Sequence, residues 1–116
     1  MTDIRVWRSR SGRVTVVAPS GELDISTSTA LRRALRQAAE GSRLVLLDLH
    51  DVTFLDSTIL GLCVTFVKRC GRSGITFMVT NASGVPLRAI TLTGLSYLLP
   101  GDERQPPELR AFPMAN

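Results

Sequence analysis

The chain has 116 residues, which is enough for one hydrophobic core and excludes two domains of ordinary size. Apolar residues make up 44% and charged residues 21%, a composition that excludes a disordered chain, a collagen-like repeat and a coiled coil. The net charge is +4, but the basic residues are scattered and aromatic residues total only 5%, so we expect no direct binding of nucleic acid.

A β-hairpin is predicted at the start of the chain. Residues 4–8 alternate in polarity, Ser11 and Gly12 supply a turn, and residues 14–18 form a run rich in β-branched side chains. The second strand is predicted to end at a turn formed by residues 19–21, which read Pro-Ser-Gly.

A first helix is predicted after the hydroxyl cluster at residues 26–29, because Ser and Thr side chains cap helices by accepting a hydrogen bond from a free backbone N–H. Apolar residues recur at helical spacing between Ala30 and Ala38, and Gly41 ends the helix. The opposite side carries three arginines, at positions 32, 33 and 36. We interpret them as a solvated helix face, with the steering of an acidic partner as the alternative.

Residues 44–49 form an apolar run interrupted only by Asp48, which is typical of a central strand covered on both faces. A second helix should follow, with apolar residues on one face between residues 59 and 70. Its two cysteines, Cys63 and Cys70, match neither metal-ligand spacing nor a small disulfide framework, so we predict buried free thiols. No leader and no membrane-length apolar run is present in the sequence, so we expect a cytoplasmic protein that does not bind membranes.

The remaining pattern predicts a buried strand over residues 75–79, a third helix from residue 83 and a short edge strand at residues 97–99. Residues 100–116 contain four prolines and little periodicity, so we expect a flexible tail after a folded domain that spans residues 1–99. Crossovers between buried strands need helices. The expected fold class is α/β, with a four- to five-stranded mixed sheet and helices mainly on one face.

The stretch Phe-Leu-Asp-Ser-Thr-Ile-Leu-Gly at residues 54–61 places an acid and two hydroxyls at the start of the second helix. The simplest interpretation is a helix cap, in which Asp56 or Ser57 stabilises the first turn by about 1 kcal/mol. Glu22 and Asp24 follow a neighbouring strand, and loops at the same strand ends often share one ligand-binding rim. The cluster could therefore also form a polar recognition patch.

Catalysis is less well supported. A Ser or Thr hydrolase would need His50, the only histidine, as its base, and no Gly-x-Ser-x-Gly elbow surrounds Ser57. Asp24 and Asp56 offer a divalent cation no firm third ligand, and no nucleotide-binding glycine motif occurs. We therefore expect no catalytic residue, no metal site and no cofactor.

Two motifs resemble those of the bacterial STAS-domain anti-sigma factor antagonists: Gly-Glu-Leu-Asp at residues 21–24 and the stretch at residues 54–61. The resemblance extends from about residue 4 to residue 99 and implies a small STAS-like single domain. The family signature Asp-Ser-[Ser/Thr]-Gly-Leu-Gly carries a regulatory phosphorylation site on its second hydroxyl. By position the resemblance implies Thr58, with Ser57 as the alternative.

The resemblance also implies the partner, an anti-sigma factor that is itself a Ser/Thr kinase. The unmodified antagonist binds this kinase and frees sigma factor, and phosphorylation ends the binding. ATP and Mg²⁺ would belong to the kinase, so this chain would not be an enzyme, and we expect a monomer or weak homodimer. The implied partner-binding residues are Glu22, Asp24, Asp56, Ser57, Thr58, Ile59 and Leu60.

The sequence departs from the family signature at Ile59, where the signature has glycine. A β-branched residue beside the hydroxyls would narrow the access of a kinase. The alternative hypothesis is therefore a STAS module in a stress-signalling complex that binds its partner, or a small ligand, without phosphorylation.

Overall fold

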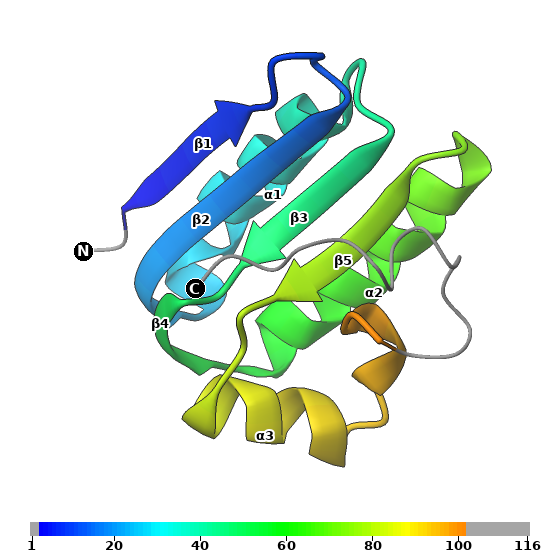
Figure 1. Ribbon diagram of the computed structural model, residues 1–116. Helices are drawn as coiled ribbons and strands as arrows, with labels where there is room; N and C mark the ends of the chain where they lie inside the picture. The colour runs from blue at the N-terminus through cyan, green and yellow to red at the C-terminus, as the bar shows by residue number, and fades with distance from the viewer. Residues whose placement is uncertain (1–2, 102–116) are drawn as a thin grey trace.

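A computed structural model describes residues 3–101 of the chain (Figure 1). The expected tail lies outside the described residues from residue 102 onward. The elements are β1 (Ile4–Arg8), β2 (Val14–Leu23), α1 (Ile25–Ala39), β3 (Leu44–Asp48), β4 (Asp51–Leu55), α2 (Ser57–Arg72), β5 (Thr76–Thr80), α3 (Gly84–Leu92) and the 3₁₀ helix η1 (Ser96–Leu98). The five strands form one mixed sheet, which confirms the predicted α/β class.

Strand β2 organises the sheet, because three other strands pair with it. β1 lies antiparallel along one edge of β2. Along the other edge β3 pairs in parallel with Val14–Val17, and β4 pairs in parallel with Ser20–Leu23. β3 and β4 therefore lie end to end, and β5 extends the sheet beyond β3.

The expected turn at residues 19–21 is wrong, because β2 continues through it to Leu23. Pro19 pairs with Ile4 of β1, and the register with β4 shifts between Gly21 and Glu22. Gly21 has a φ of 82°, a conformation that glycine adopts without steric cost. The Pro-Ser-Gly signal thus marks a bulge within a long strand and not its end.

Two other short segments differ from expectation. Residues 51–55, which were not predicted as a strand, form β4, because the far half of β2 offers free backbone groups for pairing. The expected edge strand at residues 97–99 is wrong: Tyr97 and Leu98 belong to η1, Leu99 is its C-cap, and Leu98 is buried in the core.

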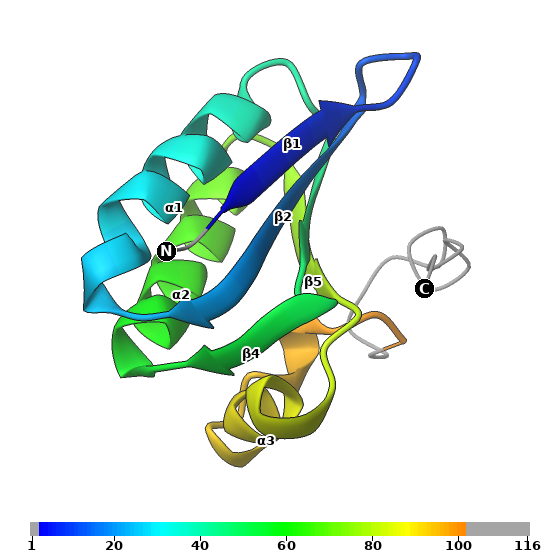
Figure 2. The same ribbon diagram turned by 90° about the vertical axis from the view of Figure 1, so that its left-hand side faces the viewer.

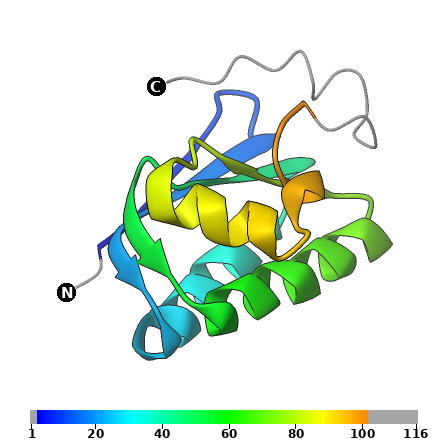
Figure 3. The same ribbon diagram turned by 90° about the horizontal axis from the view of Figure 1, so that it is seen from below.

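The helices lie mainly on one face of the sheet, as predicted. Figure 2 shows α1 and α2 side by side on that face, and Figure 3 shows α3 next to β4, which it contacts. The rings of Phe66 and Phe77 meet edge to face between α2 and β5, with centroids 4.9 Å apart. The core between sheet and helices includes Val17, Leu31, Leu35, Val45, Leu47, Leu62, Phe66, Phe77 and Val79. Among residues 3–101, none of the helices is long and apolar enough to span a membrane.

Both cysteines face this core from α2. They are free and buried, as predicted. Burial disfavours a thiolate, and it raises the pKa of Cys63 to about 12 and that of Cys70 to about 11.

We predict that neither thiol reacts with a thiol-specific reagent at pH 8 while the protein is folded. The raised pKa of Cys63 leaves roughly a thousandfold less thiolate than an ordinary cysteine has, and burial also blocks the reagent. The reaction with 5,5′-dithiobis(2-nitrobenzoate) is followed by the absorbance of the released thiolate. Its rate in the folded protein is compared with its rate in guanidinium chloride. Rapid reaction of the folded protein would contradict the described packing of α2.

Candidate functional site

The helix starts of α1 and α2 lie at the same end of the sheet, because their preceding strands run in parallel. Leu23, the last residue of β2, pairs with Leu55, the last residue of β4. The backbone N–H of Asp56 also donates to the carbonyl of Leu23, at 3.2 Å. The structure therefore brings Asp24 and Asp56 to one edge. We call residues 22–25 and 54–58 together the helix-start edge.

Asp24 is the N-cap of α1. Its carboxylate accepts hydrogen bonds from the backbone N–H of Ser26, at 2.9 Å, and from the Ser26 hydroxyl, at 2.5 Å. The Thr27 hydroxyl in turn accepts from the backbone N–H of Asp24, at 3.0 Å, and completes a capping box. The hydrogen bond from the Ser26 hydroxyl is the main reason that the pKa of Asp24 lies below its ordinary value.

This cap corrects the expectation that residues 26–29 stand before the helix. They lie inside α1, which begins at Ile25. The cap position is fixed by where β2 ends, and only Asp24 occupies it. The hydroxyls of Ser26 and Thr27 support the cap from within the first turn.

Asp56 is the N-cap of α2. The sequence alone leaves the choice between Asp56 and Ser57 open. The Asp56 carboxylate accepts from the backbone N–H of Ile59, at 3.1 Å. Within residues 3–101 neither the Ser57 nor the Thr58 hydroxyl makes a hydrogen bond. Ser57 is exposed and Thr58 is half-buried. Neither hydroxyl therefore has a structural role among the described residues.

Ile59, which the family resemblance places among the partner-binding residues, is buried. Its side chain is 0% exposed and belongs to the core, and Leu60 packs partly against the same core. Its φ is not in the left-handed region, so the helix does not require glycine there. The β-branched side chain therefore points away from the two hydroxyls and leaves them uncovered.

Two exposed apolar residues at the helix-start edge were not predicted as part of the site. Ile25, directly after the Asp24 cap, is 73% exposed, and Phe54, which pairs with Glu22, is 41% exposed. The sequence did contain a signal for Ile25, because an isoleucine directly before four hydroxyl residues stands out as an apolar side chain in a polar helix start. These residues add an apolar surface beside the carboxylates and hydroxyls, as protein-binding sites commonly have.

His50 lies at the opposite end of β4 from Ser57. The five residues of β4 separate the two side chains by about 17 Å, so His50 cannot act as a base for this hydroxyl. Its Nε2 instead lies 3.9 Å from the Asp51 carboxylate. Among residues 3–101, no three His, Cys, Asp or Glu side chains are grouped to hold a metal ion.

Comparison with known proteins gives a consistent result. The sequence matches the STAS domain family over residues 8–104. It is 31% identical to the anti-sigma-B factor antagonist of Bacillus subtilis (strain 168) over 80 residues, which cover 69% of this chain and 73% of that protein.

Solved structures show the same fold. An anti-sigma factor antagonist from Mycobacterium paratuberculosis is 30% identical, with a TM-score of 0.75 over 86% of this chain and 84% of that chain. The anti-sigma factor antagonist SpoIIAA in its unphosphorylated form is 16% identical, with a TM-score of 0.73 over 84% and 85% of the two chains. The phosphorylated form of Bacillus SpoIIAA, also 16% identical, has a TM-score of 0.66 over 84% and 88%.

The lowered pKa of Asp24 predicts an acid-dependent contribution to stability. Because the folded pKa lies below that of the unfolded chain, the charged cap stabilises the fold above the ordinary value of 3.8, and this contribution is lost as the pH falls through the folded pKa. In Asp24→Asn the amide oxygen still caps α1 but carries no charge. The difference in unfolding free energy between wild type and this variant should therefore shrink below about pH 4.

The measurement is urea unfolding between pH 3 and pH 7. Asp3→Asn is the matched control, because Asp3 is an exposed carboxylate that caps no helix and forms no ion pair within the described part of the chain. A constant difference between wild type and Asp24→Asn across this range would contradict the role of the charged cap.

Proposed function

Because this chain belongs to the STAS domain family, we propose that it is an anti-sigma factor antagonist that binds an anti-sigma factor with Ser/Thr kinase activity and so releases sigma factor. The observation that carries the proposal is the pair of free hydroxyls, Ser57 and Thr58, in the first turn of α2 beside two capping carboxylates. The names of two relatives at about 30% identity support it. The chain acts as ligand and substrate in the cytoplasm, and not as an enzyme.

The partner docks on the helix-start edge. Ile25 and Phe54 provide exposed apolar area, and Glu22, Asp24 and Asp56 provide negative charge around it. A basic patch on the kinase would complement these carboxylates and would orient the hydroxyls toward its active site. Ile59 is not part of this contact, because its side chain is buried.

Phosphorylation of Thr58 ends the binding. The kinase transfers the γ-phosphoryl group of ATP to the Thr58 hydroxyl oxygen, a kinase base accepts the hydroxyl proton, and ADP leaves. The new group carries a charge of about −1.5 to −2. The free N–H groups of the first turn tolerate this charge in the free protein. In the complex the added charge and its hydration shell disrupt a closely packed contact.

The solved structures of SpoIIAA in phosphorylated and unphosphorylated forms support such a switch in a protein of the same fold. The buried position of Ile59 supports it too, since the departure from the family signature does not obstruct the hydroxyls. Thr58 is preferred over Ser57 by its place in the signature.

We predict that Thr58→Asp weakens binding to the cognate anti-sigma kinase by tenfold or more, while Thr58→Ala binds like the wild type. An aspartate supplies part of the phosphate charge, whereas alanine removes only an unbonded hydroxyl. Isothermal titration calorimetry with the purified kinase and ADP measures both affinities. Equal affinities of the two variants would contradict the switch.

Incubation with the kinase and ATP, followed by intact-mass measurement, identifies the modified residue. Wild type and Ser57→Ala should each gain one phosphoryl group, and Thr58→Ala should gain none. If only Ser57→Ala fails to gain the mass of a phosphoryl group, the modified residue is Ser57. Tight binding with no gain in any chain would favour the alternative of a STAS module that works without phosphorylation.

A further inference from the structure

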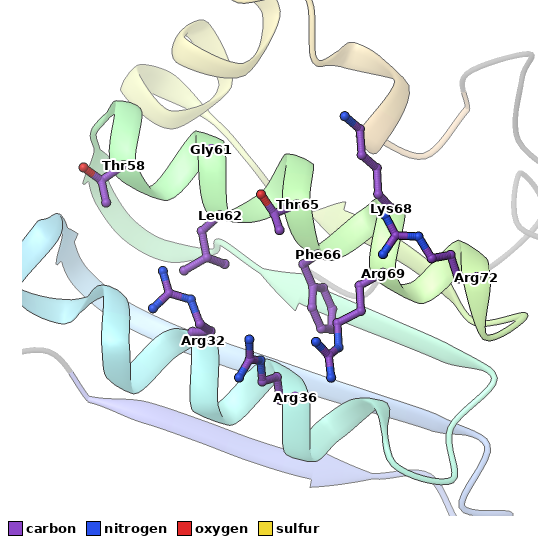
Figure 4. Close-up of a pocket in the computed structure, with 10 residues that line it drawn as sticks. All are labelled: Arg32, Arg36, Thr58, Gly61, Leu62, Thr65, Phe66, Lys68, Arg69 and Arg72. Carbon is purple, nitrogen blue, oxygen red and sulfur yellow. The ribbon is translucent and has the colours of Figure 1, made fainter.

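A groove runs between α1 and α2 on the side of the helices that faces away from the sheet (Figure 4). Its volume is about 470 Å³, and Thr58 lies at one end and Arg72 at the other. These two residues mark the first and last turns of α2, so the groove follows the helix for about 21 Å. The helix-start edge and this groove are thus one continuous surface.

The rim of the groove is strongly basic. Five exposed cations line it: Arg32, Arg36, Lys68, Arg69 and Arg72. None of the residues that line it is acidic, and within the described part of the chain none of the five cations forms an ion pair. Figure 4 shows Arg36 of α1 and Arg69 of α2 extending toward each other across the groove. Five like charges along one groove without a carboxylate among the lining residues repel one another, and a bound anion would relieve this repulsion.

The floor of the groove is different in character. Leu62 and Phe66 lie at its base, and Gly61 leaves open space, because a Cβ built there meets no atom within 4 Å. Phe66 is only 5% exposed, so no aromatic face is available to stack on a base. Leu62 is also only 6% exposed, so the accessible floor is formed by Gly61 and Thr65. This uncharged strip between two basic rims matches an amphipathic helix with small apolar residues between its acidic ones.

We propose that this groove binds an acidic amphipathic helix of the anti-sigma factor. The inference deepens the proposed function and depends on it, since it assigns the same partner a second contact along α1 and α2. The partner helix lies parallel to the groove, its carboxylates pair with Arg36 and Arg69, and its small apolar residues lie over the exposed Gly61 and Thr65. A groove about four helical turns long accommodates a partner helix of ordinary length.

The groove also connects docking to the switch. Thr58 and Arg32 line the same end of it. A phosphate on Thr58 would place a charge of about −1.5 to −2 in the field of Arg32 and would lower the positive potential that attracts the partner's carboxylates into the groove. Modification of one hydroxyl would thereby weaken the contact along α1 as well as the contact at the helix-start edge.

The test is a charge reversal far from Thr58. The double variant Arg36→Glu/Arg69→Glu should bind the purified cognate kinase, with ADP and at low salt, at least about tenfold more weakly than wild type. The matched control is Arg33→Glu/Arg88→Glu, which makes the same charge change at exposed positions outside the groove and should bind within about twofold of wild type. Circular dichroism confirms that both variants fold. Thr65→Trp, which fills the groove without changing its charge, should weaken binding as well.

A reciprocal substitution identifies the contact directly. Replacing glutamates by arginine on an acidic helix of the kinase should restore binding to Arg36→Glu/Arg69→Glu. If the groove variants bind the kinase with wild-type affinity while Thr58→Asp still weakens binding, the groove contact is wrong. The proposed function is then unaffected. Failure of the wild type to bind any cognate kinase would overturn both. Self-association that only the groove variants lose would assign the groove to a second copy of this chain and also overturn the proposal.

Discussion

The parallel pairing of β2 with both β3 and β4 is the constraint on which the site depends. Because β3 and β4 lie end to end along one edge of β2, the ends of β2 and β4 meet, and Leu23 stands beside Leu55. β2 is followed at once by α1, and β4 by α2. The two helices therefore begin side by side and pack next to each other on one face. The shared edge and the groove between the helices both follow from this pairing.

Much of the fold was predictable, because its signals are local. The apolar runs of β3 and β5 and the helical spacing in α1 and α2 identified those elements, and an acid before Ser57 identified a helix cap. What was not predictable depends on pairing partners. Residues 19–21 look like a turn until β4 is present to continue the sheet, and residues 51–55 form a strand only because β2 extends past β3. The choice of Asp24 as cap likewise depends on where β2 ends.

The site was only partly predictable, because residue types are local signals whereas the direction of each side chain depends on the tertiary structure. Residue types located the carboxylates and hydroxyls, but neighbouring residues on a helix point about 100° apart, so Thr58 and Ile59 separate into surface and core. Only the tertiary structure distinguishes them. The sequence alone favours a solvated face for the three arginines of α1 over the steering of an acidic partner, and it does not distinguish one arginine from another. In the structure Arg32 and Arg36 line the groove with Arg69 of another helix, and Arg33 does not.

The composition of the groove has a consequence for how it can be regulated. Four of its five cations are arginines, and arginine keeps its proton at any physiological pH. The groove contains no histidine and, among the described lining residues, no carboxylate. A change of pH within the physiological range would leave the charge of arginine side chains unchanged. If Thr58 is phosphorylated as proposed, the charge of the groove would respond to the enzymes that add or remove the phosphate, and not to proton concentration.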